Sequence, residues 1–123
     1  MTKKKDNLFI NRVKSVGFAF KGAVYLIKNE SSIQIQFVIA IIMTIAGFYF
    51  KLSSTEWLIQ IAFIGMVMSI EGLNTAVEYI ADFVHPDFHT AIGVIKDIAA
   101  GAVFIASTAA IIAGLIIYIP KFL

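Results

Sequence analysis

The chain has 123 residues, of which 59% are hydrophobic and 15% are charged, and its formal net charge is +2. A mean hydropathy of +0.88 excludes an ordinary soluble domain of this length and indicates a single integral membrane domain. The absence of cysteine excludes disulfides, thiolate metal sites and cysteine nucleophiles.

The first predicted element is a surface helix over residues 7–29. Apolar residues recur at spacings of three and four, and lysines repeat every seven residues on another stripe: Ile10, Val13, Gly17, Phe20, Val24 and Ile27, with Lys14, Lys21 and Lys28. This pattern predicts a helix lying in the membrane interface with its lysines near anionic headgroups. A plain anchor without chemistry has the same pattern. The basic start, MTKKKDNLF, is not followed by the apolar run and cleavage site of a signal peptide, so we expect none.

Three apolar segments, 33–50, 55–82 and 98–119, can span a bilayer. As a helix the first is about 27 Å long, close to the ~30 Å of hydrocarbon, whereas the second is about 42 Å and must emerge or tilt. The third has no charge, and we expect Pro120 to end it. Small residues recur in it at every fourth position, at Ala102, Ala106, Ala110 and Gly114, which predicts a close helix contact. Three spans are few to surround a site, so we expect a homo-oligomer.

Charge predicts the orientation of these spans. Seven of the ten basic residues precede the first span, namely Lys3, Lys4, Lys5, Arg12, Lys14, Lys21 and Lys28. The positive-inside rule then places the N-terminus in the cytoplasm. Residues 51–56 become a short outer turn, and residues 83–96 become a cytoplasmic loop where a soluble cosubstrate can arrive.

The stretch EGLNTAVEYIAD, residues 71–82, ends the second span with four oxygen-bearing side chains. At about 100° per residue, Glu71, Asn74, Glu78 and Asp82 share one helix face. For Asp82 the alternative is a polar helix end that simply emerges into water. An acidic group near the bilayer centre costs roughly 2.5–3.5 kcal/mol even on lenient scales, and ionisable residues within a span are candidate functional residues. Glu71, near the hydrocarbon boundary, is such a candidate.

Two further charged positions reach the same level in this topology, Glu30 before the first span and Lys96-Asp97 before the third. Glu30, Glu78 and Asn74 offer the oxygen ligands that Mg²⁺ prefers. Lys96 can meet phosphate charge, while Glu71 stays free to accept a proton.

This set of side chains suits phosphoryl transfer, in which catalysis is mostly positioning and charge neutralisation. The usual nucleotide motifs are missing. Residues 17–22 have the glycine spacing of a Walker A loop but lack its Lys-Ser/Thr pair, and there is no HRD or DFG motif. An ATP site must therefore be of an unrelated kind.

Non-enzymatic membrane proteins remain the competing class. An assembly factor can use the small-residue stripe, and a proton or cation carrier can use the carboxylate face. A carrier should hold its ionisable groups near the bilayer midplane, whereas here they gather at one leaflet, which favours the enzyme.

Three runs resemble the small bacterial diacylglycerol kinase family, which includes undecaprenol kinases. They are KGAVYLIKNE (21–30), EGLNTAVEYIAD (71–82) and HPDFHTAIGVIKDIAAGAV (85–103). The resemblance covers nearly the whole chain in the same order and spacing. It implies a homotrimer of three-span chains with an N-terminal surface helix in the bacterial cytoplasmic membrane. It also implies transfer of the γ-phosphate of MgATP to the hydroxyl of a membrane lipid, with no nucleic acid partner.

Carried over to this sequence, the resemblance makes Glu71 the catalytic base and Glu30 and Glu78 the ligands of Mg²⁺. Asn74, Lys96 and Asp97 match active-site positions, the last two near the nucleotide phosphates, and Asp82, Asp87 and His89 match the nucleotide-side loop. Without the family, His89 would be interpreted as a solvated loop residue. The surface helix departs from the family at Arg12 and Phe18. The lipid is diacylglycerol or undecaprenol, and NTA, HPDFH and KDIAAGAV are more similar to the undecaprenol kinases.

Overall fold

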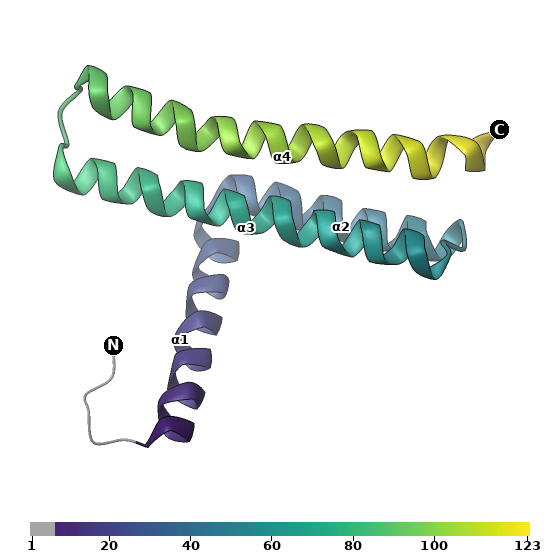
Figure 1. The fold of residues 1–123 in the computed structure, drawn as a ribbon, viewed down its shortest axis with the longest axis horizontal. Helices are drawn as coiled ribbons and strands as arrows, with labels where there is room; N and C mark the ends of the chain where they lie inside the picture. The colour runs from purple at the N-terminus through teal and green to yellow at the C-terminus, as the bar shows by residue number, and fades with distance from the viewer. Residues whose placement is uncertain (1–6) are drawn as a thin grey trace.

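The computed structural model describes residues 7–123 as four helices, α1 (Leu8–Asn29), α2 (Ser31–Tyr49), α3 (Ser54–Val84) and α4 (Thr90–Phe122). Helices α3 and α4 run side by side in opposite directions, α2 packs along α3, and α1 projects steeply away from this bundle (Figure 1). The predicted all-helical architecture, one helix followed by three long apolar ones, is confirmed. Lys3, Lys4 and Lys5 of the basic N-terminal group lie outside the described residues.

Helix α1 begins at Asn7, whose side-chain Oδ1 accepts a hydrogen bond from the Ile10 backbone at 2.9 Å. None of its residues is buried. Apolar side chains such as Phe9 and Phe20 are 75% and 70% exposed, so something other than this chain must cover them. The membrane interface is such a cover. A single residue in extended conformation, Glu30, joins α1 to α2.

Helices α2, α3 and α4 are each long and apolar enough to cross a membrane, with 19, 31 and 33 residues. Most of their large apolar side chains point outward, and the hydrophobic residues buried among the described ones are few: Ile33, Leu52, Ala81, Ala106, Ile117 and Tyr118. In water this distribution would expose far more apolar surface than a folded monomer tolerates. The chain is therefore built for lipid, as a multi-pass membrane protein.

Two sequence-based boundaries are corrected by the structure. The expected cytoplasmic loop over 83–96 shrinks to five residues, His85 to His89, because α3 continues to Val84 and α4 begins at Thr90. Hydropathy marks where a chain leaves the hydrocarbon, but a helix continues into water as long as its backbone bonds are made. Pro120 does not end α4, which runs on to Phe122; a proline in the last turn removes only one helical hydrogen bond.

Helix α3 has a well-defined start. Ser53 and Glu56 form a capping box, in which the Glu56 backbone donates to the Ser53 hydroxyl at 3.1 Å and the Ser53 backbone donates to the Glu56 carboxylate at 2.9 Å. Close to this turn α2 and α3 approach tightly. A Cβ added to Gly47 would lie 2.5 Å from Cη2 of Trp57, so only glycine fits there.

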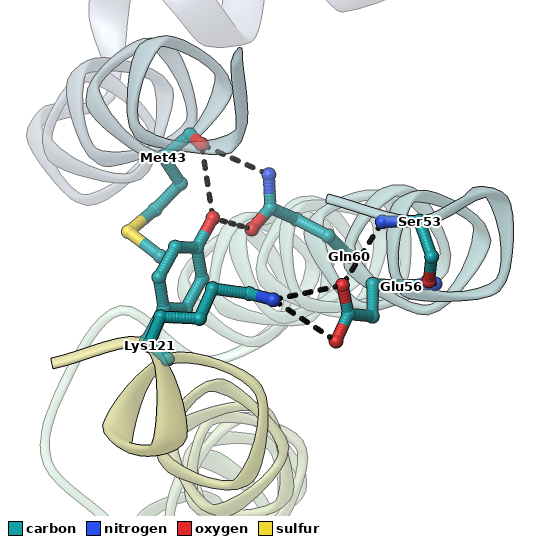
Figure 2. A network of polar contacts seen from close by, with 6 residues as sticks. Met43, Ser53, Glu56, Gln60 and Lys121 are labelled. Carbon is teal, nitrogen blue, oxygen red and sulfur yellow. Dashed lines mark hydrogen bonds and ion pairs between the residues drawn. The ribbon is translucent and has the colours of Figure 1, made fainter. Parts of the chain in front are cut away.

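A polar network ties the three long helices together at the end away from the α3–α4 loop (Figure 2). The Gln60 side chain donates to the Met43 carbonyl at 3.0 Å and accepts from the Tyr118 hydroxyl at 2.6 Å. Lys121 near the end of α4 pairs with Glu56 at 3.1 Å. Gln60 and Tyr118 are buried, so these contacts satisfy polar groups that would be costly inside a bilayer.

The small-residue stripe of α4 has mixed surroundings. Ala106 is buried, whereas Ala110 and Gly114 line an apolar groove of about 580 Å³ between α2, α3 and α4. Gln36 also lines this groove.

Candidate active site

The centre of the site is Glu71, which is 8% exposed. Two amides hold its carboxylate, one on each oxygen. Gln36 of α2 donates from Nε2 to Oε1 at 3.4 Å, and Asn74 of α3 donates from Nδ2 to Oε2 at 3.2 Å. An acidic group held in this way has a fixed orientation, which is what a general base requires.

The same two amides leave unpaired acceptors beside Glu71. Oε1 of Gln36 and Oδ1 of Asn74 are buried and have no hydrogen-bond partner among residues 7–123. Their orientation is set by chemistry, since turning either amide over would place its oxygen against a carboxylate oxygen. A buried acceptor without a partner costs free energy, so this place suits a ligand that brings a donor or a cation.

Glu30 reaches the same region from the α1–α2 link. Its Oε1 accepts a hydrogen bond from the Tyr79 hydroxyl at 2.5 Å, and that hydroxyl lies 3.1 Å from the hydroxyl of Tyr25 in α1. Tyr79 directly follows Glu78 in the sequence, and Glu78 is half-buried. The structure therefore brings Glu30 to the turn of α3 that carries Glu78.

An ion pair between Lys96 of α4 and Asp82 of α3 joins the two longest helices near the loop that connects them. Their charged groups are 2.6 Å apart, and the side chains are 37% and 61% exposed. This ion pair places the lysine one turn of α3 beyond Tyr79, which holds Glu30. Asp97, the next residue of α4, is exposed. A phosphate group arriving here would compete with Asp82 for Lys96.

The loop histidines have structural partners. His89 is the N-cap of α4, and its Nδ1 accepts from the Ala91 backbone at 3.0 Å. Nδ1 of His85 lies 2.7 Å from the carbonyl oxygen of Asp87, and the two imidazole rings are 5.2 Å apart. His89 therefore shapes the start of α4, a role that the sequence interpretation did not foresee.

The donor set fits a magnesium ion that keeps water and phosphate ligands. Within residues 7–123 no three His, Cys, Asp or Glu side chains form a cluster able to enclose a metal. Mg²⁺ does not need such a cage, because it is usually bound by one or two carboxylates together with substrate phosphates. Glu30 and Glu78 would provide the carboxylates, and Oδ1 of Asn74 is a buried oxygen without a partner in the part of the chain that the structure describes.

Three side chains of this region were missed from the sequence: Gln36, Tyr25 and Tyr79. Gln36 had a usable signal, since a polar residue within an apolar span is exceptional for the same reason as Glu71. The tyrosines had none, because tyrosine is common at membrane interfaces. Arg12 and Phe18, where the surface helix departs from the family, are both exposed on α1.

Carboxylates, amides and a lysine lie toward one end of a bundle of long apolar helices, a set of groups suited to a phosphotransferase embedded in a membrane. The chain matches the prokaryotic diacylglycerol kinase family over residues 17–118, a range that contains every predicted site residue. The protein belongs to this family and is a lipid kinase.

Individual relatives agree with this assignment. The chain is 35% identical to the undecaprenol kinase of Bacillus subtilis (strain 168) over 122 residues, which cover 98% of this chain and 99% of the relative. It is 26% identical to the diacylglycerol kinase of Escherichia coli (strain K12) over 104 residues, 85% of each chain. A diacylglycerol kinase of Haemophilus influenzae is 29% identical over 94 residues, 76% of this chain and 80% of that one.

Proposed function

We propose that this lipid kinase transfers the γ-phosphate of MgATP to the hydroxyl of undecaprenol at the cytoplasmic face of the bacterial inner membrane. The choice of lipid rests on the higher identity and fuller coverage of the undecaprenol kinase among the relatives. The choice of mechanism rests on one observation, the buried Glu71 carboxylate held between two amides.

In the proposed reaction, Glu71 is the general base. It accepts the proton of the lipid hydroxyl while the hydroxyl oxygen attacks the γ-phosphorus and ADP leaves. Gln36 and Asn74 keep the carboxylate in a single orientation, so little reorganisation is needed when the hydroxyl arrives.

The charge of the nucleotide is met by residues around Glu71. Glu30 and Glu78 would hold Mg²⁺, with Asn74 nearby, and the ion supplies charge neutralisation at the phosphate oxygens. Lys96 exchanges Asp82 for a phosphate oxygen, which lowers the free energy of the charge that develops in the transition state. Asp97, Asp87 and His89 border the nucleotide from α4 and the α3–α4 loop.

The proposed orientation places the N-terminus and this site in the cytoplasm. Four basic residues of α1, Arg12, Lys14, Lys21 and Lys28, precede the first span, as the positive-inside rule requires. Water-soluble ATP then reaches the site from the cytoplasm, and the lipid enters sideways from the inner leaflet.

We further propose that the protein works as a homotrimer. The outward apolar faces of α2, α3 and α4 leave surface for neighbouring helices, and Ala and Gly on α4 allow close approach. In such an assembly a neighbouring subunit can help enclose the site.

Product analysis tests the substrate. Purified protein in detergent micelles receives radiolabelled ATP with either undecaprenol or diacylglycerol, and Glu71→Gln serves as the inactive control. We expect the label to enter the undecaprenol product at least tenfold faster. Faster labelling of diacylglycerol would assign the enzyme to the other lipid, and no labelling of either would contradict both.

A further inference from the structure

We propose that Tyr79 is a positioning residue that, together with Tyr25, presents the Glu30 carboxylate to the Mg²⁺ of the nucleotide. This inference rests on the metal-binding role proposed for Glu30. It concerns two tyrosines to which neither the sequence pattern nor the resemblance gives a role.

The geometry of the contact is that of a strong hydrogen bond. Tyr79 Oη donates to Glu30 Oε1 at 2.5 Å, the short range of a hydroxyl on an ionised carboxylate. Tyr25 Oη lies 3.1 Å from Tyr79 Oη. The two rings meet edge to face, with centroids 6.4 Å apart and planes at 87°, an arrangement that aromatic pairs favour.

Glu30 has little else to orient it. It is the single residue between α1 and α2, and although it occupies the N-cap position of α2, its side chain makes no capping hydrogen bond. A glutamate side chain has several rotatable bonds, and ordering it costs conformational entropy. The Tyr79 hydroxyl removes that freedom before the nucleotide arrives.

The contact also leaves the carboxylate usable. Tyr79 occupies Oε1, so Oε2 stays available to the cation. Carboxylates that bind metals are typically hydrogen-bonded on their other side, and loss of such an outer partner costs 10–100-fold in metal affinity or activity.

The position of α1 makes the tyrosine pair possible. Leu26 of α1 lies so close to α3 that a Cβ on Gly72 would be 3.0 Å from its Cδ1. This approach brings Tyr25, the preceding residue, over Tyr79. The tyrosine pair thus connects the surface helix, the link and α3 at the point where the nucleotide charge must be met.

The test measures Mg²⁺-dependent binding of a non-hydrolysable ATP analogue to the purified protein in micelles, by calorimetry. We expect Tyr79→Phe, which keeps the ring and loses only the hydroxyl, to weaken the Mg²⁺-dependent binding about tenfold. Tyr25→Phe should weaken it less, by about two- to threefold. Tyr49→Phe is the matched control, since Tyr49 is exposed and ends α2, far along that helix from Glu30, and it should match the parent.

Glu30→Gln separates the inference from the proposed function. If Glu30→Gln weakens binding but Tyr79→Phe does not, the positioning role is wrong and the metal role stands. If Glu30→Gln binds like the parent, the metal role itself is wrong. Tyr79→Phe made in the Glu30→Gln background should add little further loss, because both act through one carboxylate. A full additional loss would show that Tyr79 acts elsewhere and would overturn the proposal.

Discussion

Glu71 is the only charged side chain that is buried among residues 7–123. In a helix designed only to span lipid this position would be apolar, since an acid there costs several kcal/mol. Two amides from two helices face its carboxylate. These three polar groups at one point of an apolar bundle are the observation on which the proposed catalytic role rests.

The first prediction concerns this base. Glu71→Gln keeps the size and shape of the side chain but cannot accept the substrate proton. We expect the turnover number to fall by about 10²–10⁴, with nucleotide binding changed less than twofold. Steady-state kinetics with labelled ATP and analogue calorimetry measure the two quantities. Full kinase activity in the purified variant would rule out Glu71 as the base.

The second prediction concerns the amide on α2. Gln36→Leu removes the donor to Glu71 and should lower the turnover number about tenfold, with little change in the KM for ATP. Leucine is well tolerated in a bilayer, so the variant should insert and fold normally. Gln34→Leu is the matched control, because Gln34 is exposed on the same helix and donates to the Lys28 carbonyl instead. Equal losses in both variants would mean that Gln36 acts through the helix start rather than through the base.

Residue by residue, the sequence predicts the acidic face well because it lies on one helix. Helical geometry alone brings Glu71, Asn74, Glu78 and Asp82 together. Contacts between helices, such as Tyr79 with Glu30 or Gln36 with Glu71, depend on packing that no spacing rule encodes. His89 illustrates the same limit, since its capping of α4 becomes visible only when the helix start is known.

At the scale of elements, the apolar segments predict the helices but not their ends. Helix α4 starts at Thr90, about two turns before the apolar run, because its first turns lie beyond the hydrocarbon. This extension carries Lys96 to Asp82, and in the proposed site it places a lysine near the nucleotide phosphates.

The third prediction concerns the contact between α2 and α3. Gly47→Ala would place a Cβ 2.5 Å from the Trp57 ring, and the rigid indole has to move. We expect a loss of about 1–3 kcal/mol in the free energy of unfolding, measured as denaturation in mixed micelles. Gly22→Ala in α1 is the control, since nothing lies within 4 Å of the added Cβ, and it should be neutral or stabilising. An unchanged stability of Gly47→Ala would mean that the two helices can separate freely at this point.

At the scale of the whole molecule, the polar network that stabilises the bundle and the candidate site lie toward opposite ends. The Met43–Gln60–Tyr118 network closes the bundle at one end (Figure 2), and the carboxylate site lies toward the other. The groove between α2, α3 and α4 runs from Gln36 to Tyr118.

The fourth prediction tests this separation. Tyr118→Phe leaves the buried Oε1 of Gln60 without its donor and should cost about 1–3 kcal/mol of stability. The turnover number at a temperature where the variant is folded should stay within twofold of the parent. Thermal denaturation and kinetics in the same micelles measure both. A tenfold loss of turnover in the folded variant would show that the two ends are coupled.

The single-residue link at Glu30 has a consequence for the enzyme in its native setting. We expect α1 to follow the plane of the lipid headgroups and α2 the bilayer normal, so that the backbone torsions of Glu30 would absorb a change in the angle between them. A thinner or more curved bilayer would therefore change the orientation of the Glu30 carboxylate along with the backbone of the link. We expect the affinity for nucleotide to vary with acyl-chain length in reconstituted vesicles. The enzyme would then respond to the thickness and curvature of the membrane in which its lipid substrate is dissolved.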